Sequence, residues 1–236
     1  MSAAESLRQH LARYDALRQH RDPDFRVRLH RLQAFQARRL QHTHAALIAD
    51  PRYHDATELF LTDIYGGIDL LPMAREIERA LPLASKLLPD SVFATSATAV
   101  EIMALIQEVD EQLAALMFEQ HGVTEITHDN YLAAFRELGR YDDWRHRMEL
   151  AIQLGYGLDR YVRSRLIHAT FRMASRPAHK YGLGTLYDFL GRGFEAMRPL
   201  GSTHELFERM AKDELAIIDR IAAGDPDPFL LRGKTL

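Results

Sequence analysis

The side chains of this chain that could do chemistry are a few histidines and carboxylates, and two of them have a spacing that suits a metal ion. His54 and Glu58 stand four residues apart, so on a helix they share one face and could hold one side of a metal ion. An exposed ion pair has the same spacing and is the preferred interpretation. His44, close to Leu40 and Leu47, is the histidine that we expect to be buried. It is either one ligand of a mixed histidine and carboxylate site or, preferably, a core histidine hydrogen-bonded to a neighbouring helix.

Three charged side chains interrupt apolar segments. Asp63 lies in "ELFLTDIYGG", residues 58–67, two positions before Tyr65. Asp110 and Arg165 each fall within the apolar stripe of a predicted helix. Because an unpaired buried charge is too costly to keep, we expect Asp110 or Asp63 to meet Arg165 across the core. We expect Asp110 in particular to be largely buried within reach of Arg165 or another arginine. Such a pair is either structural or lines a polar pocket, so Asp63, Tyr65, Asp110 and Arg165 are the candidate ligand-binding residues.

Other constellations that carry chemistry are absent or badly placed. The chain has no cysteine, which excludes disulfides, thiolate metal sites and cysteine nucleophiles. One Glu-x-x-His motif, Glu125 to His128, straddles the predicted helix start at Thr127. A di-iron site of the helical-bundle type is therefore disfavoured. Gly191 and Gly193 match part of a dinucleotide fingerprint but lie inside a predicted helix, where that fingerprint does not work.

The elements that must position these residues are helices, since helix caps and helical periodicity recur along the chain and strand signals are almost absent. About nine or ten helices with short connections predict an all-α, single-domain multi-helix bundle over residues 1–236. The organisation that we expect comprises an N-terminal helix at 1–20, a long helix at about 25–49, a break at Gly155 and Gly157, and a loosely attached tail at 224–236.

Composition and charge limit the environment and partners. Of the 236 residues, 47% are hydrophobic and 27% charged, with a net charge of −3. Residues 1–52 carry ten arginines against five acidic residues, and residues 53–135 carry three basic residues against fourteen acidic ones. With a pI near 6.5, the chain lacks the basic footprint of a nucleic-acid-binding protein. We see no signal peptide and no stretch that could span a bilayer, so a cytoplasmic location is expected.

Several segments resemble one family. "THAALIADPRYHDATELFLTDIYG", "NYLAAFRELGR" and the closing "LFERMAKDELAIIDRI" are similar to the bacterial FFLEELY-motif proteins, and the resemblance extends over residues 20–221. It implies the helical fold and no established activity, so it assigns no catalytic residue. The chain departs from the namesake motif, with Leu59 in place of the first Phe and Thr62-Asp63 in place of the paired glutamates.

Two functions from different classes follow from these observations. The first is a non-enzymatic helical protein that binds a partner or a small ligand, in a regulatory role. The alternative is a metal- or haem-dependent oxidoreductase on an all-α scaffold, which would use the histidines and carboxylates described above. Whether the chain is an enzyme, and which cofactor or partner it takes, stays open at the level of the sequence.

Overall fold

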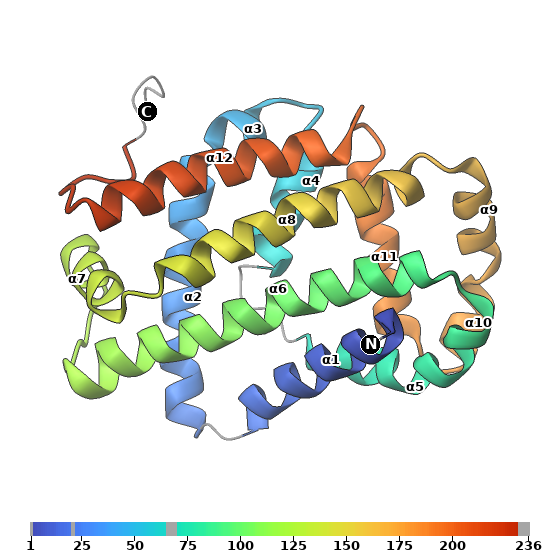
Figure 1. Ribbon diagram of the computed structural model, residues 1–236, viewed down its shortest axis with the longest axis horizontal. Coiled ribbons are helices and arrows are strands. Elements are labelled where there is room, and N and C mark those ends of the chain that lie inside the picture. Colours follow the sequence, from blue (N-terminus) through green and yellow to red (C-terminus); the bar gives the residue numbers. More distant parts are fainter. Residues whose placement is uncertain (1, 20–21, 65–69, 231–236) are drawn as a thin grey trace.

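The chain is helical throughout the residues that the computed structural model describes, which are 2–19, 22–64 and 70–230 (Figure 1). Over these ranges there is no strand, so the all-α prediction is confirmed. The α-helices are α1 (Ala3–Gln19), α2 (Pro23–Thr43), α3 (Ala45–Ala49), α4 (His54–Leu59), α5 (Leu71–Leu87), α6 (Asp90–Ala114), α7 (His128–Leu138), α8 (Tyr141–Val162), α9 (Arg165–Met173), α10 (Ser175–Lys180), α11 (Gly184–Met197) and α12 (Thr203–Ala222). Two π-helical segments, η1 (Phe60–Ile64) and η2 (Ala115–Gln120), continue α4 and α6.

The described ranges hold twelve α-helices, where nine or ten were expected, because some predicted helices are broken. The helix predicted at 25–49 is split into α2 and α3 at His44, whose backbone lies at φ −101° and ψ 19°. Asp22 caps the start of α2 by accepting a hydrogen bond from the backbone N–H of Phe25 at 2.8 Å. The break at His44 ends this capped helix at a residue whose side chain is fully buried.

Helix α8 joins two segments that the sequence predicts to be separate, and this prediction is wrong. The helix runs from Tyr141 to Val162 through both Gly155 and Gly157. A Cβ atom at Gly155 would lie 2.8 Å from Cα of His204, and one at Gly157 would lie 2.7 Å from Oγ1 of Thr95. The two glycines therefore allow α12 and α6 to approach α8 closely, and do not end the helix.

Helix α6 lies at the centre of the fold. Figure 1 shows α1, α6, α8 and α12 as a row of neighbouring helices, with α2 and α11 running across it. Residues of α6 belong to each of the three apolar clusters of the core, one toward α1 and α5, one toward α4, α8 and α12, and one toward α2 and α7. Burial of this apolar surface is the main force that holds the helices together.

The expectation that no stretch of the chain could span a bilayer has to be corrected for α6 and its continuation η2. The continuous helix Asp90–Gln120 is long and apolar enough to cross a bilayer when judged by length and composition. The central helix of a globular bundle has the same composition, and half of its most apolar window is buried inside this fold. The apolar character of Asp90–Gln120 is thus accounted for by its central position in the core.

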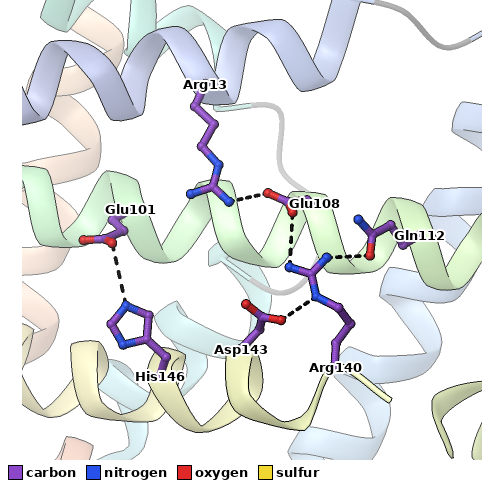
Figure 2. Close-up of polar contacts among 7 residues, drawn as sticks. All are labelled: Arg13, Glu101, Glu108, Gln112, Arg140, Asp143 and His146. Atoms are coloured by element: carbon purple, nitrogen blue, oxygen red, sulfur yellow. Dashed lines mark hydrogen bonds and ion pairs between the residues drawn. The ribbon is translucent and has the colours of Figure 1, made fainter. Parts of the chain in front are cut away.

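Polar contacts at the surface tie α1 and α8 to α6 (Figure 2). Glu108 of α6 contacts Arg13 of α1 and lies 3.2 Å from Arg140, just before α8. Arg140 also contacts Asp143 and donates to Gln112 at 2.6 Å. Partial burial alone would raise the pKa of Glu108, but the two arginines outweigh it and lower that pKa. Such half-exposed pairs stabilise little individually, and here they fix the position of α1 on α6.

The end of the chain is attached more firmly than expected over residues 224–230. Arg136 donates to the carbonyl of Asp225 at 2.6 Å, and Nε of Arg220 donates to the Asp225 carboxylate at 2.7 Å. Phe229 packs against the apolar cluster around α7 and α12. Residues 224–230 are thus held by these contacts, whereas residues 231–236 lie outside the described part, and the loose attachment of the tail as a whole stays a prediction.

Candidate functional site

Of the two partners predicted for Asp110, Arg165 or another arginine, the structure excludes Arg165 and leaves Arg147 of α8, whose charge acts on the carboxylate. Asp110 is buried, as expected, with 1% of its surface exposed, but Arg165 is exposed at the start of α9. The chain leaves α8 after Val162, and Ser164 caps α9 by accepting the N–H of Ile167 at 3.3 Å. This new helix start carries Arg165 out of the apolar stripe to which it was assigned.

Two other candidates fall where the structure gives no side-chain position. Asp63 belongs to the π-helical segment η1, but its side chain, like the whole of Tyr65, lies outside the described residues. The same holds for Gly66 and Gly67.

Asp110 is instead surrounded by amides and one arginine. Nε2 of Gln33 donates a hydrogen bond to Oδ2 of Asp110 at 3.3 Å. The positive charge of Arg147 on α8 favours the ionised carboxylate and acts to lower the pKa of Asp110. Burial raises the pKa of Asp110 to about 6, because these contacts do not fully replace water. Within the described part of the chain its Oδ1 accepts no hydrogen bond, so the loss of hydration on burial is only partly compensated.

A second set of buried charges lies between α2 and α12. Nη1 of Arg39 lies 2.6 Å from both carboxylate oxygens of Glu214, and Nε2 of His44 lies 3.3 Å from Oε1. Burial alone would raise the pKa of Glu214, but Arg39 and His44 outweigh it and lower the pKa to about 2. Burial alone would lower the pKa of His44, yet Asp213 and Glu214 raise it.

This arrangement bears on what His44 does. The side chain is fully buried, as expected, and faces Asp213 and Glu214 of α12, but within the described residues neither ring nitrogen makes the hydrogen bond that was also expected. Its contact with Glu214 has the distance of an ion pair, without the alignment of a good hydrogen bond. His44 thus helps to neutralise a buried carboxylate.

Tyr131 of α7 lies between the two sets of charges. Its hydroxyl is buried and, among the described residues, makes no hydrogen bond. Burial raises the pKa of Tyr131 to about 12, and both arginines and both acids act on it. The whole group is here called the buried polar network, and its members are Gln33, Gln36, Arg39, His44, Asp110, Tyr131, Arg147 and Glu214.

The buried polar network and the other candidate ligands do not form a metal site in the part of the chain that the structure describes. No group of three or more His, Asp or Glu side chains in those ranges could hold one ion. His54 is exposed, and its Nδ1 lies 2.7 Å from the carbonyl oxygen of Ile48. His44, His54 and Glu58 therefore do not come together as ligands. We interpret the network as a set of buried ties between α2, α6, α7, α8 and α12.

A feature of another kind lies on the opposite side of α6. A cavity of about 260 Å³ is enclosed by α1, α5, α6 and α11. Of its twenty lining residues none is charged, and only Tyr14 and Ser96 carry a polar side-chain atom. Leu88 and Leu190 belong to the lining and are also exposed, so they mark the mouth. At about 260 Å³ this apolar cavity is larger than a second recess of about 50 Å³ between α2, α6, α8 and α12, and it could hold a small molecule.

Small side chains and one buried carboxylate create this space. Ala80 and Ala84 of α5 and Ser96 of α6 belong to the lining, and larger side chains at these positions would take up part of the space. Both oxygens of Glu76 accept backbone N–H groups at the start of α11, from Thr185 at 3.3 Å and from Leu186 at 2.7 Å. This contact holds α11 against α5 and so keeps that wall in place.

Sequence reasoning missed the cavity because its walls come from segments far apart in the chain. The signal in the sequence is modest: α1 carries a regular apolar stripe at Leu7, Leu11 and Tyr14, while the facing segments are rich in alanine. Small residues on apolar faces are compatible with tight packing as well as with an open space, so periodicity alone does not separate the two.

Comparison with known proteins assigns the chain to a family. The family model described as Domain of unknown function (DUF8198) matches residues 16–228. The chain belongs to this family. No curated protein matches it, and no solved structure does. Membership in DUF8198 brings no activity with it, so the functional argument rests on the geometry.

Proposed function

We propose that the protein is a non-enzymatic binding protein for a small, largely aliphatic molecule held in the cavity between α1, α5, α6 and α11. The observation that carries this proposal is a space of about 260 Å³ with an uncharged, almost wholly apolar lining. Interiors of proteins are close-packed, and voids larger than a water molecule are few.

The size and lining restrict the ligand. A dry cavity of about 150 Å³ already binds benzene, and drug-sized molecules occupy about 300–1,000 Å³. The cavity of about 260 Å³ therefore fits a single chain or ring better than a larger molecule. A charged group would lose its hydration inside without gaining a partner, so the polar end of the ligand lies at the mouth beside Leu88 and Leu190.

Other parts of the proposal rest on the sequence. The resemblance of residues 43–66 and of further segments to the bacterial FFLEELY-motif proteins, the regulatory role and the cytoplasmic location are included on that basis. The oxidoreductase alternative gains no support from the described residues, since they offer no group of metal ligands.

Displacement of an uncharged fluorescent naphthylamine probe by straight-chain alcohols tests the proposal. We expect saturable displacement that strengthens with chain length until the chain outgrows the cavity. Ala80→Phe places a ring in the space and should abolish displacement. Ala94→Phe is the matched control, because Ala94 is exposed on α6, and it should bind as the wild type does. Equal binding by the wild type and Ala80→Phe would refute the cavity as the site.

A further inference from the structure

The segment formed by α9 and α10 covers α11 without burying any of its own residues. Neither helix contains a buried side chain. Three large apolar residues project from it and the turn that follows: Leu166 is 76% exposed, Met173 81% and Tyr181 73%. Scattered exposed apolar residues are common, but these three are concentrated in one short stretch that has no core of its own.

Positive charge surrounds these side chains. Residues 158–198 carry eight basic and three acidic residues. The three acids are already in contact with cations of this region or its neighbour α12: Asp159 with His204, Asp188 with His179, and Glu195 with Arg198. Six exposed cations make no ion pair within the described ranges, namely Arg160, Arg163, Arg165, Arg172, Arg176 and Lys180.

The exposed apolar residues and the arginines of α9 lie on two adjacent faces of the helix. Leu166 and Met173 are seven residues apart, which places them on the same outward face of α9. Arg165 and Arg172 repeat the same spacing on the adjacent face. An apolar stripe bordered by arginines is the pattern of helices that lie in the interface of a membrane.

The inner face of α9 fixes this surface to the wall of the cavity. The ring of Phe171 stacks on Tyr187 at 4.2 Å and meets Phe194 edge-on at 4.9 Å, and both partners belong to α11. The same helix α11 contributes Leu190 to the mouth of the cavity. The exposed segment is therefore packed directly against α11, the helix that forms one wall of the cavity.

We infer that the α9–α10 surface docks on an anionic lipid bilayer, with Leu166, Met173 and Tyr181 entering the interface and the arginines contacting lipid headgroups. Anionic lipids supply the negative charge that the neighbouring protein surface lacks. A stable protein interface needs roughly 800 Å² from each partner, more than three separate side chains offer, whereas a bilayer accepts single apolar side chains. That the bilayer is also the source of the cavity's ligand rests on the proposed function.

Co-sedimentation of the full chain with vesicles tests the docking. We expect binding to vesicles in which about a third of the phosphatidylcholine is replaced by phosphatidylglycerol, and little binding to phosphatidylcholine alone. Added sodium chloride should weaken it, because the attraction is partly between exposed charges. Binding that ignores both the lipid charge and the salt would overturn the inference.

Two surface variants and one control locate the contact. Leu166→Ser/Met173→Ser and Arg165→Gln/Arg172→Gln/Arg176→Gln should each lower vesicle affinity by at least ~10-fold while keeping the helical circular dichroism of the wild type. Val27→Ser/Arg38→Gln changes an exposed apolar and an exposed basic residue on α2 and should leave affinity unchanged. Loss of binding in the control alone, or a dimer in solution that the Leu166→Ser/Met173→Ser variant abolishes, would overturn the inference in favour of another surface or a second copy.

The cavity-filling variant separates this inference from the proposed function. Ala80→Phe should lose the apolar ligand and still bind anionic vesicles. If the wild type binds vesicles but no apolar ligand, the cavity proposal fails and the docking stands. If the ligand binds and the vesicles do not, the reverse is true.

Discussion

The ionised carboxylate of Asp110 destabilises the folded protein because it is buried, and substitution by asparagine should reveal the size of this cost. Burial raises its pKa in the folded protein to about 6, from an ordinary value of 3.8. The folded state therefore holds the proton more tightly, and the free energy of unfolding falls as the pH rises from about 4 to about 6, by a total of about 3 kcal/mol. Asp110→Asn removes the charge with little change of shape. We expect it to be as stable as the wild type near pH 4 and more stable by roughly 2–3 kcal/mol at pH 8.

Urea unfolding of both proteins at the two pH values measures this difference. A variant that is less stable than the wild type at pH 8 would contradict the expected cost of ionising Asp110. It would mean that the carboxylate is needed as a partner for Arg147 or for the amides around it.

Glu214 differs from Asp110, because Arg39 and His44 compensate its buried negative charge. Its pKa is lowered from 4.5 to about 2, so its stabilising contribution is present above pH 4.5 and is lost as the pH falls toward 2. Glu214→Gln would leave Arg39 and His44 buried without their counter-charge. We expect a loss of about 3–5 kcal/mol in the free energy of unfolding at pH 7.

Asp219 provides the matched control on the same helix. It forms an exposed pair with Arg145 at 2.9 Å, and exposed pairs contribute little. Asp219→Asn should cost only a small fraction of the Glu214→Gln loss in the same denaturation experiment. Equal losses for the two variants would show that burial of the Arg39–Glu214 pair is not what matters.

At the scale of elements, the crossing of α8 with α12 depends on a missing side chain. A Cβ atom at Gly155 would meet the backbone of His204 at 2.8 Å, and backbone cannot move aside cheaply. We expect Gly155→Ala to destabilise the fold by about 1–3 kcal/mol through overpacking. Gly157→Ala should cost less, because its close neighbour is the side chain of Thr95.

Gly201→Ala is the control, since nothing lies within 4 Å of the position where its Cβ would be. Thermal melting of the three variants gives the ranking. A Gly155→Ala protein as stable as Gly201→Ala would show that the α8–α12 distance is adjustable.

Elements and their ends could be predicted where the determinants are local. Thr127 caps α7, as expected, and forms a capping box with Asn130, while Gly139 ends that helix in the left-handed conformation at φ 64°. A cap involves neighbours in sequence, so its residues are readable directly. The glycines of α8 look the same in the sequence, but their role depends on which helix packs against them, and that is not local information.

In the candidate site, too, features set by the local sequence could be predicted and features set by the packing of helices could not. Burial of His44 and Asp110 follows from their positions on apolar stripes, and both are buried as expected. Their partners could not be predicted, because the pairing depends on the crossing of α2, α6, α8 and α12. The assignment of Arg165 failed for a related reason, since a two-residue break before α9 changed the face on which it lies.

At the scale of the whole molecule, an occupied cavity should raise the stability of the entire fold. A ligand present at a hundred times its dissociation constant adds about 2.7 kcal/mol. For a chain of this length that corresponds to an increase of roughly 5–10 °C in Tm. We expect this shift with an apolar ligand in differential scanning fluorimetry of the wild type and no shift for Ala80→Phe. A comparable shift in both proteins would place the ligand elsewhere.

The first helix has a consequence for how the cavity can be altered. Leu7, Leu11 and Tyr14 of α1 form part of the cavity lining, and they lie before residues 16–228, which the family model matches. Substitution of these three side chains would therefore reshape the recess while leaving the buried Arg39–Glu214 pair between α2 and α12 untouched.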